Sequence, residues 1–225
     1  KGLIMVFDYV INPQGIESES FRRIRQVTDL SSLSREQQQV VMRIVHSVGM
    51  PEIAKQVCFS DNACAAGRQA LAAGGAILCD VEMVKQGITK RMVEAEPLCF
   101  LNHIDVPALA KSRGETRSMA ALDYWQPHLA GSVVMIGNAP TALFRLLEMI
   151  AQGRASGLGS NVGLPALIIA MPVGFVGAAE SKQALWDVHR ELGIECITLL
   201  GNQGGSAVTA SACNALLRCN RDEWY

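Results

Sequence analysis

Five short, uninterrupted apolar runs, separated by stretches that suit helices, constrain the fold of this 225-residue chain most strongly. These runs are Ala76–Cys79, Leu98–Leu101, Val133–Ile136, Ala166–Met171 and Cys196–Leu200. A strand without polar alternation must be covered on both faces, which is typical of parallel sheets that lie between helices. The pattern therefore predicts an α/β fold with a flavodoxin-like, doubly wound, mostly parallel five-stranded sheet.

Helical spacing predicts an N-terminal helical segment ahead of this sheet. Residues 18–28 carry apolar side chains at helical intervals, and Asn12 followed by Pro13 is typical of a helix start. A second helix fits Arg35–Val48, with Ser34 as its N-cap. The further predicted helices are Asp61–Ala73, Val81–Gln86, Thr116–Leu129, Thr141–Gln152, Ala178–Leu192 and Ser206–Leu217.

Composition narrows the class of protein. Hydrophobic residues make up 49% of the chain and the formal net charge is -1, so neither disorder nor a basic surface for nucleic acid is indicated. Lys1–Asp8 lacks a signal-peptide pattern, and the uncharged run Leu164–Ala179 is interrupted by proline and glycine and shorter than the ~20 residues of a membrane-spanning helix. We expect a cytoplasmic protein without membrane or nucleic-acid partners.

The seven cysteines are odd in number, and no Cys-x-x-Cys pair occurs. Reduced, mostly buried thiols are therefore expected rather than a disulfide frame or a metal site.

We expect a single domain over residues 1–225, with a frayed polar tail at Arg218–Tyr225. The glycines of 157–163 do not form a dinucleotide fingerprint, because the third glycine comes one residue late and the segment precedes a strand. This segment is interpreted as a flexible loop.

Ligands of doubly wound sheets bind beyond the carboxyl ends of the strands. The turn Gly201–Ser206 follows a predicted strand and opens a helix, so its N–H groups could bind a carboxylate or a phosphate. A tight turn that requires glycine explains the same residues equally well. The other candidates at this edge are Asp80, Asn102-His103, Gly137-Asn138 and Pro172–Gly174.

A polar stripe is predicted on the second helix. Arg43 and His46 lie three residues apart, and Gln39 precedes Arg43 by four, so the three side chains share a helix face. Arginine binds carboxylates, and histidine exchanges a proton near neutral pH. A solvated helix face with an ordinary surface histidine would show the same spacing.

Several of these segments together resemble the precorrin-8X methylmutase family of cobalamin biosynthesis. The resemblance covers nearly the whole chain in the same order, and its longest motifs are IGNAPTALF and PVGFVGAAESK. The residues that carry it are Asp8-Tyr9, Glu19–Ile24, Arg43–His46, Ala76–Val84, Thr116–Ser118, Val133–Phe144, Met171–Lys182 and Gly204–Ala207.

The resemblance implies a cytoplasmic, homodimeric isomerase that needs no cofactor and no bound metal. Its substrate would be a tetrapyrrole polycarboxylate, precorrin-8X or its cobalt form, on which a methyl group moves from C-11 to C-12. The family's catalytic histidine matches His46, and its substrate-binding serine and arginine match Ser20 and Arg43. Further substrate-binding residues are expected at Thr89, Arg117, Asn138, Gly204, Gly205 and Ser206.

Protonated His46 is then expected to act as a general acid that makes the macrocycle electron-poor and eases the methyl shift. Two other functions remain open from the sequence: a non-catalytic tetrapyrrole carrier with the same fold, and a flavin or nucleotide binder. The sequence also leaves open whether the substrate carries cobalt.

Overall fold

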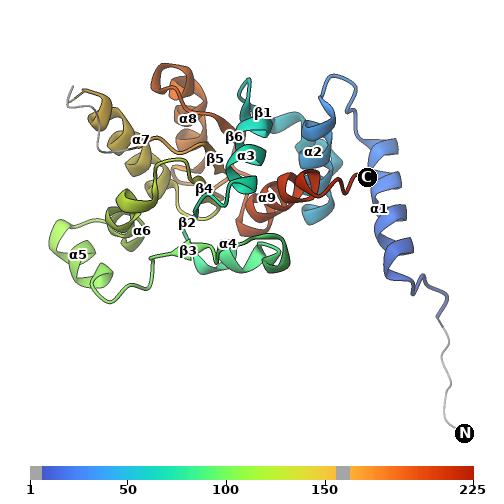
Figure 1. Ribbon diagram of the computed structural model, residues 1–225, viewed down its shortest axis with the longest axis horizontal. Coiled ribbons are helices and arrows are strands. Elements are labelled where there is room, and N and C mark those ends of the chain that lie inside the picture. Colours follow the sequence, from blue (N-terminus) through green and yellow to red (C-terminus); the bar gives the residue numbers. More distant parts are fainter. Residues whose placement is uncertain (1–6, 156–162) are drawn as a thin grey trace, which may run out of the picture.

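A six-stranded sheet lies at the centre of the protein (Figure 1). The structure is a computed structural model, and it describes residues 7–155 and 163–225. The strand order is β1-β6-β5-β4-β2-β3. The strands are β1 (Val57–Phe59), β2 (Ile77–Cys79), β3 (Leu98–Cys99), β4 (Val133–Ile136), β5 (Leu167–Ala170) and β6 (Cys196–Leu199).

The five predicted strands are present and parallel to one another, which confirms the α/β prediction. Numbered among themselves along the chain they follow the order 2-1-3-4-5, the flavodoxin-like arrangement. The predicted number of strands was wrong, because β1 adds a sixth, antiparallel strand beside β6 with Val57 opposite Leu199. This edge strand has only three residues, all half-buried, so the sequence shows no continuous apolar run there.

Two helices precede the sheet, as predicted. In α1 (Pro13–Val27), the side chain of Asn12 accepts a hydrogen bond from the N–H of Gly15 at 3.1 Å. In α2 (Arg35–Val48), Ser34 and Gln37 form a reciprocal capping box. Both helix starts follow from local sequence alone.

Helices cover both faces of the sheet because successive side chains of each strand point to opposite sides. In β4, Val133 and Met135 pack in the core on the side of α9 (Ser206–Asn220), whereas Val134 and Ile136 pack in the core on the other side. The α9 side also carries α2, α3 (Ala63–Ala72) and α4 (Glu82–Gly87), and the opposite side carries α7 (Pro140–Ala155) and α8 (Ala178–Leu192). The remaining short helices are η1 (Pro51–Gln56), η2 (Lys90–Met92), α5 (Val106–Arg113), α6 (Arg117–Ala121) and η3 (Leu122–His128).

Two local predictions were wrong, and one helix was not predicted. The expected helix Thr116–Leu129 is divided into α6 and the 3₁₀ helix η3, in which Pro127 has no N–H to donate to a continuous α-helix. The helix α5 lacks a marked apolar face, so periodicity did not predict it. The tail is not frayed, because the rings of Tyr225 and Phe21 stack with centroids 3.7 Å apart.

The predicted loop at 157–163 lies outside the described residues except for Gly163. Cys79, Cys196, Cys213 and Cys219 are buried, and the other three cysteines are half-buried free thiols. Within residues 7–155 and 163–225, no helix has the length and apolar character needed to cross a membrane.

Candidate active site around His46

His46 lies where α1 crosses α2, and its partner comes from the other helix. The Oγ of Ser20 is 2.9 Å from Nδ1 of His46. Since Ser20 occupies Nδ1, the ring nitrogen left for proton transfer is Nε2, for which no described residue provides a hydrogen-bond partner. The structure therefore brings together two predicted site residues that lie 26 positions apart.

An aromatic stack supports the His46 ring from inside the protein. Phe21, only 2% exposed, stacks on His46 with centroids 5.1 Å apart and on Tyr225 with centroids 3.7 Å apart. We call Tyr225, Phe21 and His46 the aromatic column. Phe21 follows Ser20 directly, so one turn of α1 provides both the hydrogen bond to His46 and the surface on which its ring rests.

Arg43 belongs to an internal group of charges, which we call the Glu17 cluster: Glu17, Arg43, Arg218 and Tyr225. Nη1 of Arg43 donates to the Tyr225 hydroxyl at 2.5 Å and lies 3.3 Å from Oε1 of Glu17. The Tyr225 hydroxyl donates to the same carboxylate at 2.6 Å, and Nη2 of Arg218 lies 3.3 Å from it. With its side chain 16% exposed, Arg43 is paired with protein groups rather than held open to solvent.

The predicted polar stripe on α2 needs a correction. Gln39 is 1% exposed, and its side chain donates to the main-chain carbonyl of Tyr225 at 3.2 Å. The folded tail covers this part of the helix face, which periodicity within α2 could not reveal. Only Arg43 and His46 remain from the expected stripe, with His46 the more exposed of the two.

The pKa of His46 lies below its ordinary value of 6.5. Partial burial against its neighbours is the largest cause, and the positive charge of Arg43 adds to it. The negative charge of Glu17 opposes both effects. Free His46 is therefore more readily deprotonated than a solvated histidine.

A second group of predicted residues lies at the carboxyl ends of the strands. Asp80, which is 3% exposed and follows β2, accepts backbone hydrogen bonds from Gly137, Asn138 and Ala139 at 2.9–3.0 Å. These three bonds fix the turn between β4 and α7. The side chain of Asn138 is exposed beyond this turn.

The glycine turn before α9 is tightly packed. The N–H of Gly205 donates to the carbonyl of Met171 at 2.8 Å, so this N–H is not open to an anion as the sequence suggested. A Cβ on Gly204 would lie 2.2 Å from the same carbonyl oxygen. The structure thus favours the alternative explanation for these two glycines, a turn with no room for side chains, and Ser206 begins the helix directly after it.

Lys182 donates a hydrogen bond to the main chain of this turn. Sequence reasoning did not identify this contact. The side chain is fully buried, and Nζ donates to the main-chain carbonyl of Gln203 at 2.5 Å. Burial lowers the pKa of Lys182 to about 8. No carboxylate of the described residues forms an ion pair with it, and the only sequence signal was its place in the motif MPVGFVGAAESK.

The remaining two predicted residues are Thr89 and Arg117. Thr89 is half-buried, and its N–H donates to the side chain of Asn214 at 2.9 Å, which ties it to α9. Arg117 is exposed at the start of α6. Figure 1 shows α6 and α1 near opposite ends of the long axis, so one copy of the chain does not gather Arg117 with Ser20 and His46.

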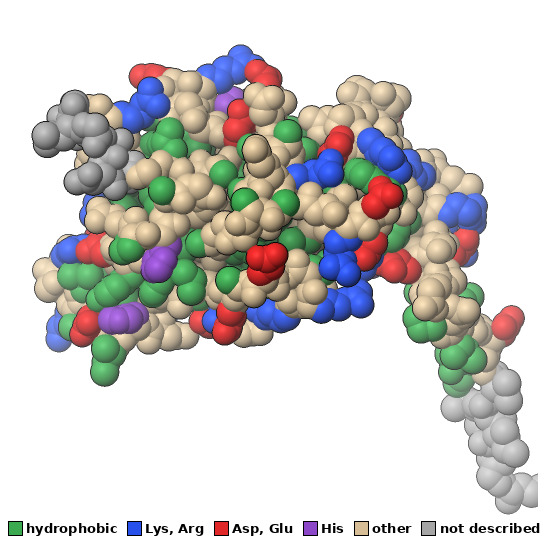
Figure 2. Space-filling model, viewed as in Figure 1, with side chains coloured by type: hydrophobic (Ala, Val, Ile, Leu, Met, Phe, Trp, Pro, Cys, Tyr) green, Lys and Arg blue, Asp and Glu red, His purple; other side chains and the backbone are tan. Residues whose placement is uncertain are grey.

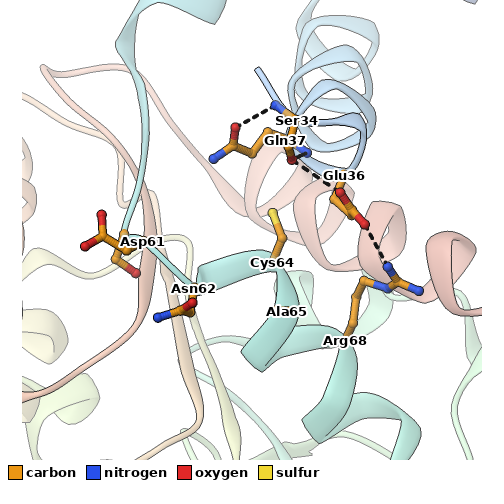
Figure 3. Close-up of a pocket in the computed structure, with 9 residues that line it drawn as sticks. Ser34, Glu36, Gln37, Asp61, Asn62, Cys64, Ala65 and Arg68 are labelled. Carbon is orange, nitrogen blue, oxygen red and sulfur yellow. Dashed lines mark hydrogen bonds and ion pairs between the residues drawn. The ribbon is translucent and has the colours of Figure 1, made fainter. Parts of the chain in front are cut away.

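Figure 3 shows a different, polar cavity of about 230 Å³ between the start of α2 and the start of α3. Its volume is below the roughly 300–1,000 Å³ of ligand pockets. Arg68 and Glu36 pair across it at 2.9 Å, and burial raises the pKa of the Cys64 thiol to about 12. The cavity contains none of the predicted substrate residues. Its lining residues are Ser34, Glu36, Gln37, Ser60, Asp61, Asn62, Cys64, Ala65 and Arg68.

Comparison with known proteins identifies the family to which these features belong. The family described as precorrin-8X methylmutase matches residues 15–219. A precorrin-8X methylmutase of Pseudomonas aeruginosa is 46% identical over 213 residues, which cover 94% of this chain and 98% of the relative. A cobalt-precorrin-8 methylmutase of Priestia megaterium is 34% identical, with 92% of this chain and 88% of the relative covered.

A solved structure agrees with this assignment. The crystal structure of precorrin-8X methylmutase from Thermus thermophilus superposes with a TM-score of 0.80 at 34% identity. The match covers 93% of this chain and 97% of the other. The chain therefore belongs to the precorrin-8X methylmutase family.

Proposed function

We propose that this chain is an isomerase that moves a methyl group from C-11 to C-12 of precorrin-8X, with His46 as the general acid. Membership of the family supports the reaction. The observation that carries the role of His46 is its geometry: Ser20 engages Nδ1 and the ring rests on Phe21, so Nε2 is left to meet a substrate.

In this proposal His46 donates a proton to the macrocycle, which draws electron density from the ring and eases the shift of the methyl group to the neighbouring carbon. The C-11 bond to the methyl group breaks as the C-12 bond forms. A proton returns from the product to His46, so no proton is gained or lost overall. Positioned proton transfer of this kind contributes about 10²–10⁴-fold in rate.

The substrate carries several carboxylates, and cationic and N–H donors suit them. Arg43 would bind one of them by exchanging Glu17 for a substrate carboxylate. The other proposed contacts come from the residues at the carboxyl ends of the strands and from Arg117. They are Thr89, Arg117, Asn138, Gly204 and Ser206, whereas Gly205 shapes the turn because its N–H already donates to Met171.

We favour the cobalt-free substrate. The relatives from Pseudomonas aeruginosa and from Sinorhizobium, each 46% identical, are precorrin-8X methylmutases. Cobalt-precorrin-8 methylmutases of Priestia megaterium and Salmonella typhimurium are each 34% identical.

We further infer a cytoplasmic homodimer whose substrate pocket takes residues from both copies. The separation of α1 from α6 supports this, because a second copy could supply Arg117 to a pocket that the first copy leaves open.

Exposed apolar side chains near the N-terminal end of α1 also suit contact with a second copy. Figure 2 shows them along the segment that extends from the body of the protein before α1. Its exposed apolar residues, together with one in α1, are Phe7, Tyr9, Val10, Ile11 and Ile16.

The decisive experiment is an absorption time course of the purified protein with precorrin-8X, and separately with the cobalt form. The wild type should convert precorrin-8X to the product spectrum, and His46→Ala should lose at least about 100-fold in rate. The control is His128→Ala, an exposed histidine that stacks on Phe100 away from α2. Full turnover by His46→Ala would refute the acid role, and binding without conversion by the wild type would identify a carrier.

A further inference from the structure

The tail residue Tyr225 touches the candidate site from inside the protein and lies beyond the family match, which ends at residue 219. Its ring is nearly parallel to that of Phe21, at 16°, with centroids 3.7 Å apart. Phe21 in turn stacks on His46 at 24°, with centroids 5.1 Å apart. Phe21 therefore lies between the other two rings, and Tyr225 is at the opposite end of the aromatic column from His46.

Besides the stacking of its ring on Phe21, Tyr225 makes two hydrogen bonds through its hydroxyl. The hydroxyl donates to Glu17 on α1 at 2.6 Å and accepts from Arg43 on α2 at 2.5 Å. The guanidinium groups of Arg43 and Arg218 also face the ring, each 5.4 Å from its centroid. The ring thus bridges α1, α2 and α9, the helices that carry Ser20, Arg43 and Arg218.

Neighbouring tail residues do not have this arrangement. The guanidinium of Arg35 lies over the Trp224 ring, 3.9 Å from the ring centroid. Trp224 makes no stacking contact with Phe21. Only Tyr225, among the described residues of the tail, reaches the column beneath His46.

From these contacts we propose that Tyr225 is a positioning residue for the reaction: its ring holds Phe21, and thereby the His46 ring, in the orientation that proton transfer requires. The inference rests on the proposed role of His46. It adds a residue beyond the range 15–219 that the family model matches, and it assigns to the tail a function in turnover rather than in folding alone.

The ring and the hydroxyl have separable effects. Tyr225→Phe keeps the aromatic column and removes the bonds to Glu17 and Arg43, so kcat should stay within about twofold of the wild type. Tyr225→Leu removes the column's base, so His46 should sample other orientations and kcat should fall about tenfold. If the hydroxyl alone mattered, Tyr225→Phe would lose as much kcat as Tyr225→Leu. A kcat retained in Tyr225→Phe therefore identifies the ring as the part that acts.

Trp224→Leu is the matched control, because it removes an aromatic ring from the same tail without touching Phe21. Its kcat should remain within about twofold of the wild type, measured well below the melting temperature of each variant. Equal losses in Trp224→Leu and Tyr225→Leu would overturn the proposal in favour of a general effect of tail packing. An unchanged kcat in Tyr225→Leu would also overturn it.

A measurement that needs no turnover separates this inference from the proposed reaction. The groups that act on the His46 ring are Ser20, Phe21 and Glu17 from α1 and Arg43 from α2. We would titrate the imidazole by NMR in the wild type and the three tail variants, with the His46 signal assigned from His46→Ala.

Tyr225→Leu should loosen Phe21, admit water to the His46 ring and raise the His46 pKa toward its ordinary value, whereas Tyr225→Phe and Trp224→Leu should not. A shift in Tyr225→Leu alone supports the link between Tyr225 and His46 even if His46 is not the acid. An unshifted His46 signal in Tyr225→Leu refutes the link even if the methylmutase reaction proceeds.

Discussion

The Oγ of Ser20 and the Nδ1 of His46 lie 2.9 Å apart, and each comes from a different helix. The bond occupies Nδ1 of the imidazole and leaves Nε2 without a hydrogen-bond partner among the described residues. It also makes the orientation of His46 depend on how α1 packs against α2. Several consequences can be measured.

Replacement of Ser20 by alanine should lower kcat three- to tenfold, since a net hydrogen bond is worth about 0.5–1.5 kcal/mol and the ring would be free to rotate. KM should change little, because the serine acts on His46 more than on the substrate. Steady-state kinetics on Ser20→Ala beside Ser18→Ala, an exposed serine of the same helix, checks this. A kcat equal to that of the wild type would separate Ser20 from the reaction.

The pH dependence of turnover should report His46. The acid is active when protonated, and burial together with Arg43 lowers its pKa below 6.5, so kcat/KM should fall as pH rises through a value below 6.5. A profile of kcat/KM from about pH 5 to about pH 8 tests the prediction. A descending limb well above the ordinary histidine value would contradict it.

The same lowered pKa predicts a pH-dependent contribution to stability. The unfolded chain binds a proton to His46 more tightly than the folded protein does, so the free energy of unfolding should rise with pH from the folded pKa up to about 6.5, the unfolded value. In His46→Ala this contribution should disappear. Denaturant melts of both proteins across that window measure it, and equal pH slopes would argue against a lowered pKa.

Gly49 and Gly204 both have positive φ, but only Gly204 has no room for a side chain, so alanine variants of the two can be compared. Gly49 has φ 69° and open space around it, whereas Gly204 has φ 156° and a carbonyl oxygen 2.2 Å from the position of a Cβ. Gly49→Ala should cost about 1–2 kcal/mol of unfolding free energy from backbone strain. Gly204→Ala should cost clearly more, because the turn before α9 must also move. Similar melting midpoints for the two variants would refute the tight packing of this turn.

Asp80→Asn should destabilise the protein by about 2 kcal/mol or more, because a buried carboxylate that accepts three N–H bonds would become an amide with one accepting oxygen. The exposed Asp105→Asn is the control, with an expected change within about 0.5 kcal/mol. Loss of binding through Asn138 should accompany the loss of stability. Chemical denaturation of both variants measures the difference.

The amino-acid sequence by itself determined the layered architecture and the helix starts. Apolar runs such as Val133–Ile136 specify buried parallel strands, and Ser34 with Gln37 specifies where α2 begins. These features depend on residues within a few positions of one another, so local periodicity and capping chemistry are sufficient to predict them. Motif resemblance then singled out His46, Ser20 and Arg43.

Only the tertiary structure decided which groups act together. The pairing of Tyr225 with Glu17 and Arg43 joins residues up to 208 positions apart, and no local pattern encodes such contacts. The edge strand β1 is likewise defined by pairing with β6 rather than by its own three half-buried residues. Hydrogen bonds and ring contacts of this kind depend on distance in space, which the chain sets only when its helices have packed on the sheet.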